Sequence, residues 1–247
     1  MKVSVLMPAY NKGQCIFESI FITVNTLSKL GVDHEVVVIN DGSSDDTYEE
    51  ALRASKKFNN VKIVNYNSNE GKGHATKTGF YNSTGDLIMF FDADLDYHPE
   101  QIKLFLDMMK ENNADVIIGS KRHKDSKIEY PFVRRFLSRG YQIFNTLFLG
   151  LPFSDTQPGI KLFKREVLEK VFPKVLIKRF AFDAELLLNS KKLGYKIIEA
   201  PVDLSFMKFS STVNIKAIQN MFIDTCAIFY RDKILRYYDK VGSDEVS

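Results

Sequence analysis

Short apolar runs alternate with longer segments of helical periodicity over the first 120 residues of the chain. Runs rich in Val, Ile, Leu and Phe predict strands, and apolar residues three or four positions apart predict helices with one buried face. The predicted strands are residues 3–7, 35–39, 61–65, 87–91 and 116–118. The predicted helices are residues 14–30, 46–58, 73–81 and 99–111.

The second half of the chain has a less regular pattern. It predicts a helix over residues 131–149, a turn at 154–159, a helix over 182–193 and a strand at 196–200. A last helix places one apolar stripe along its length, which fits a membrane contact, a dimer face or a lid packed on the core. The stripe consists of Ile215, Ile218, Phe222, Cys226 and Phe229.

Strand and helix alternation at this spacing predicts an α/β fold with a mainly parallel, doubly wound sheet and right-handed crossovers. No linker or repeat divides the chain, so we expect one domain over residues 1–211, followed by an amphipathic helix and polar tail over 212–247. Ligands of such sheets bind at the carboxyl ends of the strands. Here those ends carry residues 8–11, 40–43 and 92–94.

Composition excludes several classes of protein. With 45% apolar residues, 13 Gly and 7 Pro, the chain is neither disordered nor fibrous. Its two cysteines, Cys15 and Cys226, lie far apart and lack metal-ligand spacing, which favours buried thiols in a reducing compartment. The longest apolar stretch, residues 141–153, is too short and too interrupted to cross a bilayer, so we expect a soluble or peripheral protein.

The net charge of +3 hides an asymmetry. Residues 121–179 contain fourteen Lys and Arg against five Asp and Glu, a local balance of +9, and the remainder of the chain therefore carries −6. Such segregation indicates either an anionic partner or a solvated basic face.

Three carboxylates, Asp92, Asp94 and Asp96, alternate directly after an apolar strand. They would repel one another unless a cation or basic side chains offset their charge. Oxygen ligands of this kind suit Mg²⁺ or Mn²⁺, which keep open positions for phosphates. The alternative is an acidic loop that caps the helix beginning near Pro99.

Two further segments follow strands. Asp41 stands at a strand tip, where it can accept a hydrogen bond from a nucleobase or ribose, although the polar residues after it also suit a helix cap. Gly71-Lys72-Gly73 is a candidate phosphate cradle at a helix start. Neither a Walker loop nor a Gly-x-Gly-x-x-Gly motif is present, which argues against ATPases and nicotinamide dehydrogenases.

Taken together and in order, six segments resemble the family 2 glycosyltransferases of GT-A fold, and more closely the dolichyl- or polyprenyl-phosphate sugar synthases. The resemblance covers about residues 3–210, and its Asp-Thr-Gln block is nearer to the glucosyl branch than to the mannosyl one. The segments are Pro8-Ala9-Tyr10-Asn11, Asn40-Asp41-Gly42-Ser43-Ser44-Asp45, Gly71-Lys72-Gly73, Asp92-Ala93-Asp94-Leu95, Asp155-Thr156-Gln157-x-Gly159-x-Lys161-Leu162-Phe163 and Phe182-Asp183-x-Glu185-Leu186-Leu187.

The resemblance implies a GT-A nucleotide-diphospho-sugar transferase fold and a role for each matching residue. Nucleotide binding falls to Pro8, Ala9, Tyr10, Asn11, Asp41, Lys72 and Ala93, and the metal ligands are Asp92 and Asp94, with Asp96 as a third. The acceptor phosphate falls to Lys121, Arg134, Arg135 and Ser138, and the catalytic set is Asp92, Asp94, Arg134, Ser138 and Asp183.

Some of these roles have alternatives, and some positions depart from the family pattern. The basic stretch around Arg134 also fits a solvated helix, and Asp183 also fits a buried pair with Lys161 or Arg134. Lys12 replaces a common acidic residue and Asn40 a frequent Asp, which leaves the base specificity open.

These observations predict an inverting, Mg²⁺- or Mn²⁺-dependent transfer of a sugar to polyprenyl or dolichyl phosphate, peripherally at the cytoplasmic membrane face and without nucleic acid. A phosphate monoester, with a second pKa of about 6, is already a nucleophile at neutral pH and requires no general base. The expected donor is UDP-glucose or UDP-N-acetylglucosamine, then GDP-mannose. Alternatives are transfer to a glycan hydroxyl, with Asp183 as base, and a non-catalytic nucleotide- or membrane-binding module.

Overall fold

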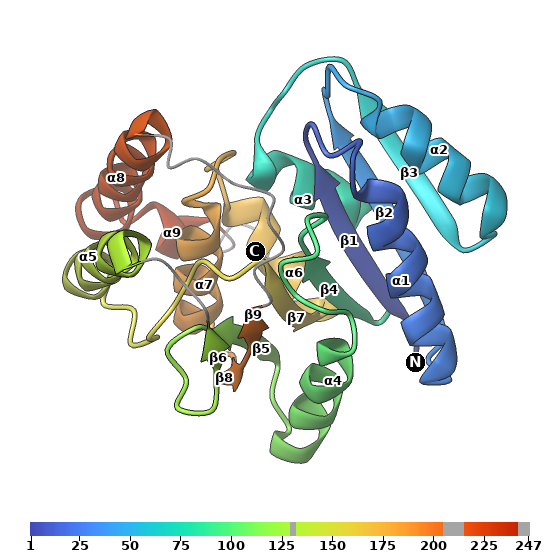
Figure 1. Ribbon diagram of the computed structural model, residues 1–247. Coiled ribbons are helices and arrows are strands. Elements are labelled where there is room, and N and C mark those ends of the chain that lie inside the picture. The colour runs from blue at the N-terminus through green and yellow to red at the C-terminus, as the bar shows by residue number, and fades with distance from the viewer. Residues whose placement is uncertain (129–131, 205–214, 242–247) are drawn as a thin grey trace.

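The computed structural model describes residues 1–128, 132–204 and 215–241, and of residues 132–137 and 215–216 it describes the backbone alone. A twisted sheet forms the centre, with helices on both faces (Figure 1). The strands are β1 (Val3–Ala9), β2 (His34–Asp41), β3 (Val61–Tyr66), β4 (Leu87–Phe91), β5 (Val116–Ser120), β6 (Lys127–Ile128), β7 (Ile160–Lys164), β8 (Ile197–Pro201) and β9 (Asp203–Leu204). The helices are α1 (Ile16–Lys29), α2 (Thr47–Lys57), α3 (Lys72–Tyr81), α4 (Gln101–Asn112), α5 (Phe132–Leu149), α6 (Arg165–Val171), a 3₁₀ turn (Phe172–Lys174), α7 (Phe182–Lys192), α8 (Ile215–Phe229), a π-helix (Tyr230–Ile234) and α9 (Tyr237–Lys240).

The main sheet has the strand order β3-β2-β1-β4-β7-β5-β8 among the described residues. Its neighbouring strands are parallel except that β7 runs antiparallel to both β4 and β5. The predicted α/β class and mainly parallel sheet are therefore confirmed. The elements predicted within the first 120 residues all occur, with ends shifted by at most two residues.

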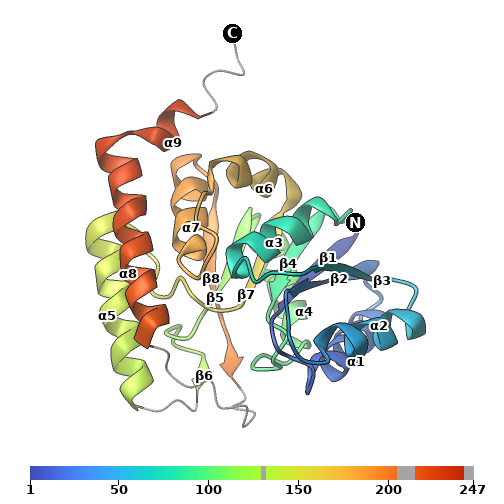
Figure 2. The ribbon, with the colours of Figure 1, turned by 90° about the horizontal axis from the view of Figure 1, so that it is seen from above.

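Two apolar layers cover the two faces of the sheet. Side chains alternate across each strand, so Val36 and Val38 pack on one layer while Val37 and Ile39 pack on the other. Helices α1, α2 and α4 cover the first face, and α3, α6 and α7 cover the second (Figure 2). Because both faces are covered, β2 is buried along its whole length, and its centre, residues 36–39, is an unbroken apolar run.

Strand β7 was not predicted. The sequence pattern indicated only the turn at residues 154–159 before it, because Lys161 interrupts the apolar run and buried strands rarely contain a charge. In the structure β7 lies in the middle of the sheet, and the Lys161 side chain is 1% exposed. Its ammonium group forms an ion pair with Asp183 on α7, which offsets the cost of burying the charge.

Helices α5 and α8 lie side by side at one edge of the molecule, next to α7 (Figures 1 and 2). Aromatic rings of the two helices pack together. The ring centroid of Phe222 lies 5.0 Å from that of Phe144 and 5.7 Å from that of Tyr141, and the centroids of Phe229 and Phe148 are 5.4 Å apart. Of the predicted stripe, Phe222 and Phe229 thus pack against α5, whereas Cys226 is exposed and is not the buried thiol that was expected.

The predicted division of the chain at residues 211 and 212 lies outside the described residues. Within the part that the structure describes, no helix has both the length and the apolar character needed to cross a membrane.

Candidate active site

The loops that follow β1, β2 and β4 meet at one edge of the sheet, because these strands are parallel neighbours in the order β2-β1-β4. The topology therefore brings together three segments that lie far apart in the sequence. They are the turn at residues 8–11, the tip of β2 at Asp41 and the acidic loop from Asp92 to Asp96.

The turn after β1 is fastened to the loop after β2. The Asn11 amide donates to Ser43 Oγ at 2.9 Å, and Asn11 Oδ1 accepts from the Ser44 amide at 2.9 Å. Asn11 adopts a φ of 50°, a left-handed conformation that asparagine tolerates better than most residues. Tyr10 remains 49% exposed beside it, while Ala9 is buried. The turn thus presents an aromatic ring on a rigid base.

Asp41 is buried at the tip of β2 and holds the loop that leads into α3. Its carboxylate accepts from the amides of Glu70 (2.8 Å) and Gly71 (3.0 Å) and from Asn69 Nδ2 (3.1 Å). Burial and the nearby Asp41 carboxylate raise the pKa of Tyr66. This loop-holding role was not predicted, and the contact of Asp41 with a nucleotide stays a prediction.

The two carboxylates after β4 each face a lysine. Asp92 Oδ1 lies 2.6 Å from the Nζ of Lys72, which begins α3, and Asp94 Oδ2 lies 3.6 Å from the Nζ of Lys12. Burial opposes the ionisation of Asp92, but the Lys72 ammonium outweighs it and lowers the pKa of Asp92. Both carboxylates keep about a quarter of their side chains exposed, 27% for Asp92 and 25% for Asp94.

Backbone geometry sets the position of these carboxylates. Leu95 has a φ of 58°, which is strained for a branched side chain and is typical of residues held at functional loops. Gly159 packs so closely on Asp92 that a Cβ there would overlap the Asp92 carboxylate. A larger residue at position 159, directly before β7, would therefore displace the Asp92 carboxylate.

Among the described residues, no three His, Cys, Asp or Glu side chains are arranged to hold a metal ion by themselves. The Asp96 amide donates to Asp94 Oδ1 at 3.3 Å, which stabilises the loop. Asp92 and Asp94 are thus the candidate ligands at this edge, and a ligand role for Asp96 stays a prediction.

A buried ion pair lies beneath the acidic loop. Lys161 Nζ on β7 lies 2.8 Å from Asp183 Oδ1 on α7, and both side chains are almost fully buried, at 1% and 3% exposure. Burial raises the pKa of Asp183 and lowers the pKa of Lys161, because each charge is costly in a dry interior. This is the pairing that the sequence offered as the alternative to a catalytic Asp183.

The second acid of the same motif, Glu185, has a supporting role. It is fully buried and accepts from the amides of Leu176 (2.9 Å) and Ile177 (2.7 Å) and from the Tyr238 hydroxyl (2.5 Å). It therefore joins α7 to the loop at residues 176–179 and to α9. That loop, residues 69–71 and Asp224 of α8 line a pocket of about 530 Å³.

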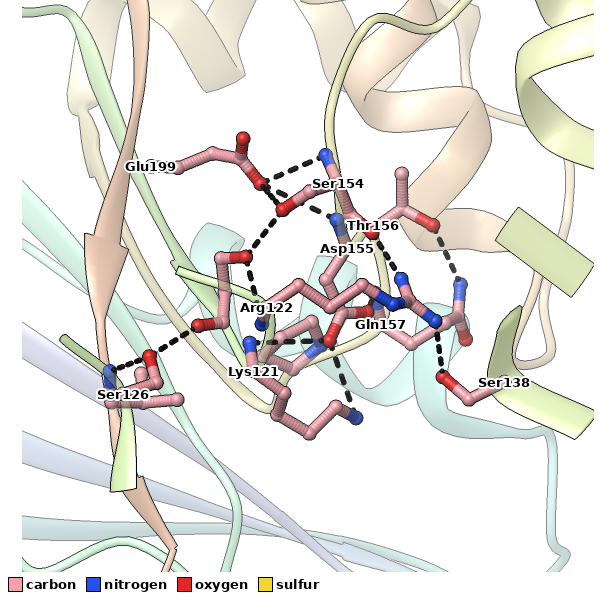
Figure 3. Close-up of polar contacts among 12 residues, drawn as sticks. Lys121, Arg122, Ser126, Ser138, Ser154, Asp155, Thr156, Gln157 and Glu199 are labelled. Carbon is pink, nitrogen blue, oxygen red and sulfur yellow. Dashed lines mark hydrogen bonds and ion pairs between the residues drawn. The ribbon is translucent and has the colours of Figure 1, made fainter. Parts of the chain in front are cut away.

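Of the candidate acceptor residues, Lys121 directly follows β5 and Ser138 lies on α5 (Figure 3). Lys121 Nζ lies 3.5 Å from Asp155 Oδ2, and the Lys121 amide lies 3.3 Å from the same oxygen. Ser138, on α5, accepts from Arg122 Nη2 at 3.0 Å. The side chains of Arg134 and Arg135 lie outside the described residues.

Arg122 was missed as a site residue. The sequence motif drew attention to Lys121, because a basic residue commonly follows Gly-Ser in the family that the chain resembles. Arg122 comes next in Gly119-Ser120-Lys121-Arg122, and only this adjacency could have pointed to it.

Many Lys and Arg side chains of residues 121–179 form ion pairs or hydrogen bonds with other groups of the protein. The pairs are Lys121 with Asp155, Lys161 with Asp183, Lys164 with Asp115 and Lys178 with Glu70, and Arg165 Nε donates to the Gly85 carbonyl. The +9 balance of residues 121–179 is therefore not one continuous anion-binding surface.

Comparison with known proteins supports the resemblance found in the sequence. The model of Glycosyl transferase family 2 matches residues 4–172. Dolichyl-phosphate beta-glucosyltransferase ALG5A of Trichomonas vaginalis is 32% identical over 240 residues, covering 93% of this chain and 74% of that protein. Glycosyltransferase AglD of Haloferax volcanii is 31% identical over 205 residues, covering 82% of this chain and 33% of that protein.

The fold is also found among solved structures. Glucosyl-3-phosphoglycerate synthase of Mycobacterium tuberculosis, in complex with Mn²⁺, UDP-glucose and phosphoglyceric acid, matches with a TM-score of 0.69. The match covers 93% of this chain and 78% of that one at 19% identity, so it establishes the shared fold alone.

Proposed function

The chain belongs to glycosyl transferase family 2, and we propose that it transfers a sugar from a nucleoside diphosphate donor, UDP-glucose first, to a dolichyl or polyprenyl phosphate. The observation that carries the donor half is the placement of Asp92 and Asp94 at the strand edge where the β1 and β2 loops converge. The acceptor half rests on the similarity to a dolichyl-phosphate beta-glucosyltransferase over most of the chain.

The residues at this edge fit a divalent cation. Carboxylate oxygens are the ligands that Mg²⁺ and Mn²⁺ prefer, and Asp92 and Asp94 each keep about a quarter of their side chain exposed. In the proposal Asp92 and Asp94 hold the metal, with Asp96 as a third ligand. When bound, the cation stabilises the negative charge of the departing nucleoside diphosphate.

The neighbouring loops bind the nucleotide in this proposal. Tyr10 offers an exposed ring for a base, and Asn11 fixes the turn that carries Tyr10, Pro8 and Ala9. Asp41 and Ala93 border the same edge, and Lys72 brings an ammonium group to the phosphates at the start of α3. The amides of Gly73 and His74 at the start of α3 donate to the Lys178 carbonyl, at 2.7 and 3.1 Å, so the group offered to the phosphates is the Lys72 ammonium rather than the helix start.

The acceptor phosphate meets Lys121, Ser138, Arg134 and Arg135 in this proposal. Because a phosphate monoester is already anionic at neutral pH, it attacks the anomeric carbon without a general base, and the configuration inverts. The buried pair of Asp183 with Lys161 agrees with this chemistry. A transfer to a glycan hydroxyl needs an accessible base, and the buried Asp183 is poorly suited to that role. A polyprenyl acceptor lies in a membrane, so the proposed site of action is peripheral, on the cytoplasmic face.

The test is a transfer assay with purified protein, Mg²⁺ or Mn²⁺, a short polyprenyl phosphate and a panel of labelled donors. The panel contains UDP-glucose, UDP-N-acetylglucosamine and GDP-mannose, and the label is counted in the organic phase. We expect label from UDP-glucose, and its loss in Asp94→Ala but not in Glu111→Ala, an exposed acid on α4. Absence of lipid product from all donors would reject the proposal.

A further inference from the structure

Arg122 joins two segments of the acceptor region, and the family motifs give it no role. Its guanidinium donates through Nη2 to Ser138 Oγ on α5, at 3.0 Å, and through Nη1 to the Ser154 carbonyl in the loop before β7 (Figure 3). The side chain is partly buried. One planar group thus spans the gap between a helix and a loop, a geometry that lysine cannot reproduce.

The chemistry of the two groups restricts the direction of the Ser138 hydroxyl. A guanidinium has donors and no acceptor, so Ser138 Oγ must be the acceptor in this contact. Its single proton is therefore turned away from Arg122 and remains available to another acceptor. A phosphate oxygen is such an acceptor, and a hydrogen bond to a charged oxygen is stronger than one between neutral groups.

A second chain of hydrogen bonds fixes the backbone that carries Arg122. Glu199 on β8 accepts only, so Ser154 donates its hydroxyl proton to Glu199 Oε1 at 2.6 Å. The 2.6 Å contact between Ser120 and Ser154 then requires Ser120 to be the donor. Ser120 Oγ in turn accepts from the Arg122 amide at 3.3 Å. The whole network has one direction and ends at a carboxylate.

We propose that Arg122 is a positioning residue for the acceptor phosphate, because it orients the Ser138 hydroxyl so that its proton points to a phosphate oxygen. The proposal rests on the proposed function, in which Ser138 binds that phosphate. It adds a residue that acts through Ser138 and needs no contact with substrate. The fixed backbone also holds the preceding Lys121 in place beside Asp155.

The test compares Arg122→Ala with Lys124→Ala, which removes an exposed charge from the same loop. We expect the KM for polyprenyl phosphate to rise about 10-fold in Arg122→Ala, with the KM for the nucleotide sugar changed less than about twofold, since one charge-assisted hydrogen bond is at stake. Lys124→Ala should match wild type. Arg122→Lys keeps the charge but not the bridge, and it should recover only part of the loss.

A double-mutant cycle separates positioning from general destabilisation. If Arg122 acts through Ser138, Arg122→Ala combined with Ser138→Ala should have the same acceptor KM as Ser138→Ala alone. Additive effects, full recovery in Arg122→Lys, or equal changes in both KM values would overturn the inference. If Arg122→Ala does not fold, Arg122→Lys supplies the same cycle. If the wild-type protein forms no lipid product, both the proposed function and the role of Arg122 are rejected. If the wild type is active and Arg122→Ala has a normal acceptor KM, only the role of Arg122 is rejected.

Discussion

The buried pair of Lys161 and Asp183 gives the sharpest prediction, because it separates a structural aspartate from a catalytic one. Lys161 Nζ and Asp183 Oδ1 lie 2.8 Å apart, and both side chains are almost fully buried. Lys161 also donates to the Pro158 carbonyl at 2.5 Å. Removal of either partner alone leaves a buried charge without compensation.

The expected cost follows from this burial. Breaking a buried pair costs about 3–5 kcal/mol, whereas an exposed pair contributes about 0–1 kcal/mol. For a chain of 247 residues, 1 kcal/mol corresponds to roughly 2–4 °C in Tm, so Lys161→Met or Asp183→Leu should lower Tm by roughly 6–20 °C. The double variant replaces both charges with apolar groups and should be close to wild type in stability.

Urea unfolding followed by circular dichroism measures these differences. The control is the exposed pair of Lys103 and Asp107 on α4, with side chains 60% and 48% exposed, where Lys103→Met should cost less than about 1 kcal/mol. Sugar transfer to polyprenyl phosphate is then measured below the unfolding transition for Lys161→Met and for the double variant. Equal turnover per folded molecule in the two is expected, because Asp183 takes no proton in the proposed reaction.

Two outcomes would refute this reasoning. A cost below about 1 kcal/mol for both single variants would mean that the pair is not buried as described. A double variant that folds but loses the turnover that Lys161→Met retains would identify Asp183 as a catalytic group, and transfer to a hydroxyl would then be the better account.

Two further predictions concern residues that support the fold and the site. Gly159→Ala should displace the Asp92 carboxylate, lower turnover at least about 10-fold and raise the Mn²⁺ concentration required in a metal titration. The control is Gly140→Ala, in open space on α5, which should leave turnover unchanged and add about 0.5–1 kcal/mol of stability. An unchanged Mn²⁺ requirement in Gly159→Ala would contradict the first. Burial raises the pKa of Glu35, but hydrogen bonds from Ser4 and Thr84 outweigh it and bring the pKa to about 2. Glu35 therefore contributes roughly 3 kcal/mol to the free energy of unfolding above pH 4.5, and this contribution is lost as the pH falls towards 2. Glu35→Gln should flatten this acid limb in urea unfolding at a series of pH values, and an unchanged limb would count against the assignment.

The first half of the fold was predictable because each element signals itself locally. Parallel strands buried on both faces, such as β2, give apolar runs, and the helices between them give apolar residues at helical spacing. Strand β7 does not, because its second residue, Lys161, is a buried lysine whose partner lies on α7, more than 20 residues further along. A local pattern contains no information on such a contact.

The candidate site shows the same division. Asp92 and Asp94 were found because they follow a recognisable strand, and family resemblance supplied their role. The function of Asp41 in holding residues 69–71 depends on a loop about 30 residues away, and the bridge from Arg122 to Ser138 crosses from the end of β5 to α5. These contacts are products of the tertiary fold, so only coordinates reveal them.

The central claim is that the acceptor is a lipid phosphate, and the most direct measurement compares a short polyprenyl phosphate with the corresponding polyprenol and with a soluble oligosaccharide. Each is incubated with labelled UDP-glucose, Mn²⁺ and the purified protein, and the product is identified by mass spectrometry. The account predicts one product, a glucose joined through phosphate to the lipid, and none from the polyprenol or the oligosaccharide. Glucose transferred to the oligosaccharide, with the lipid phosphate left unchanged, would contradict it.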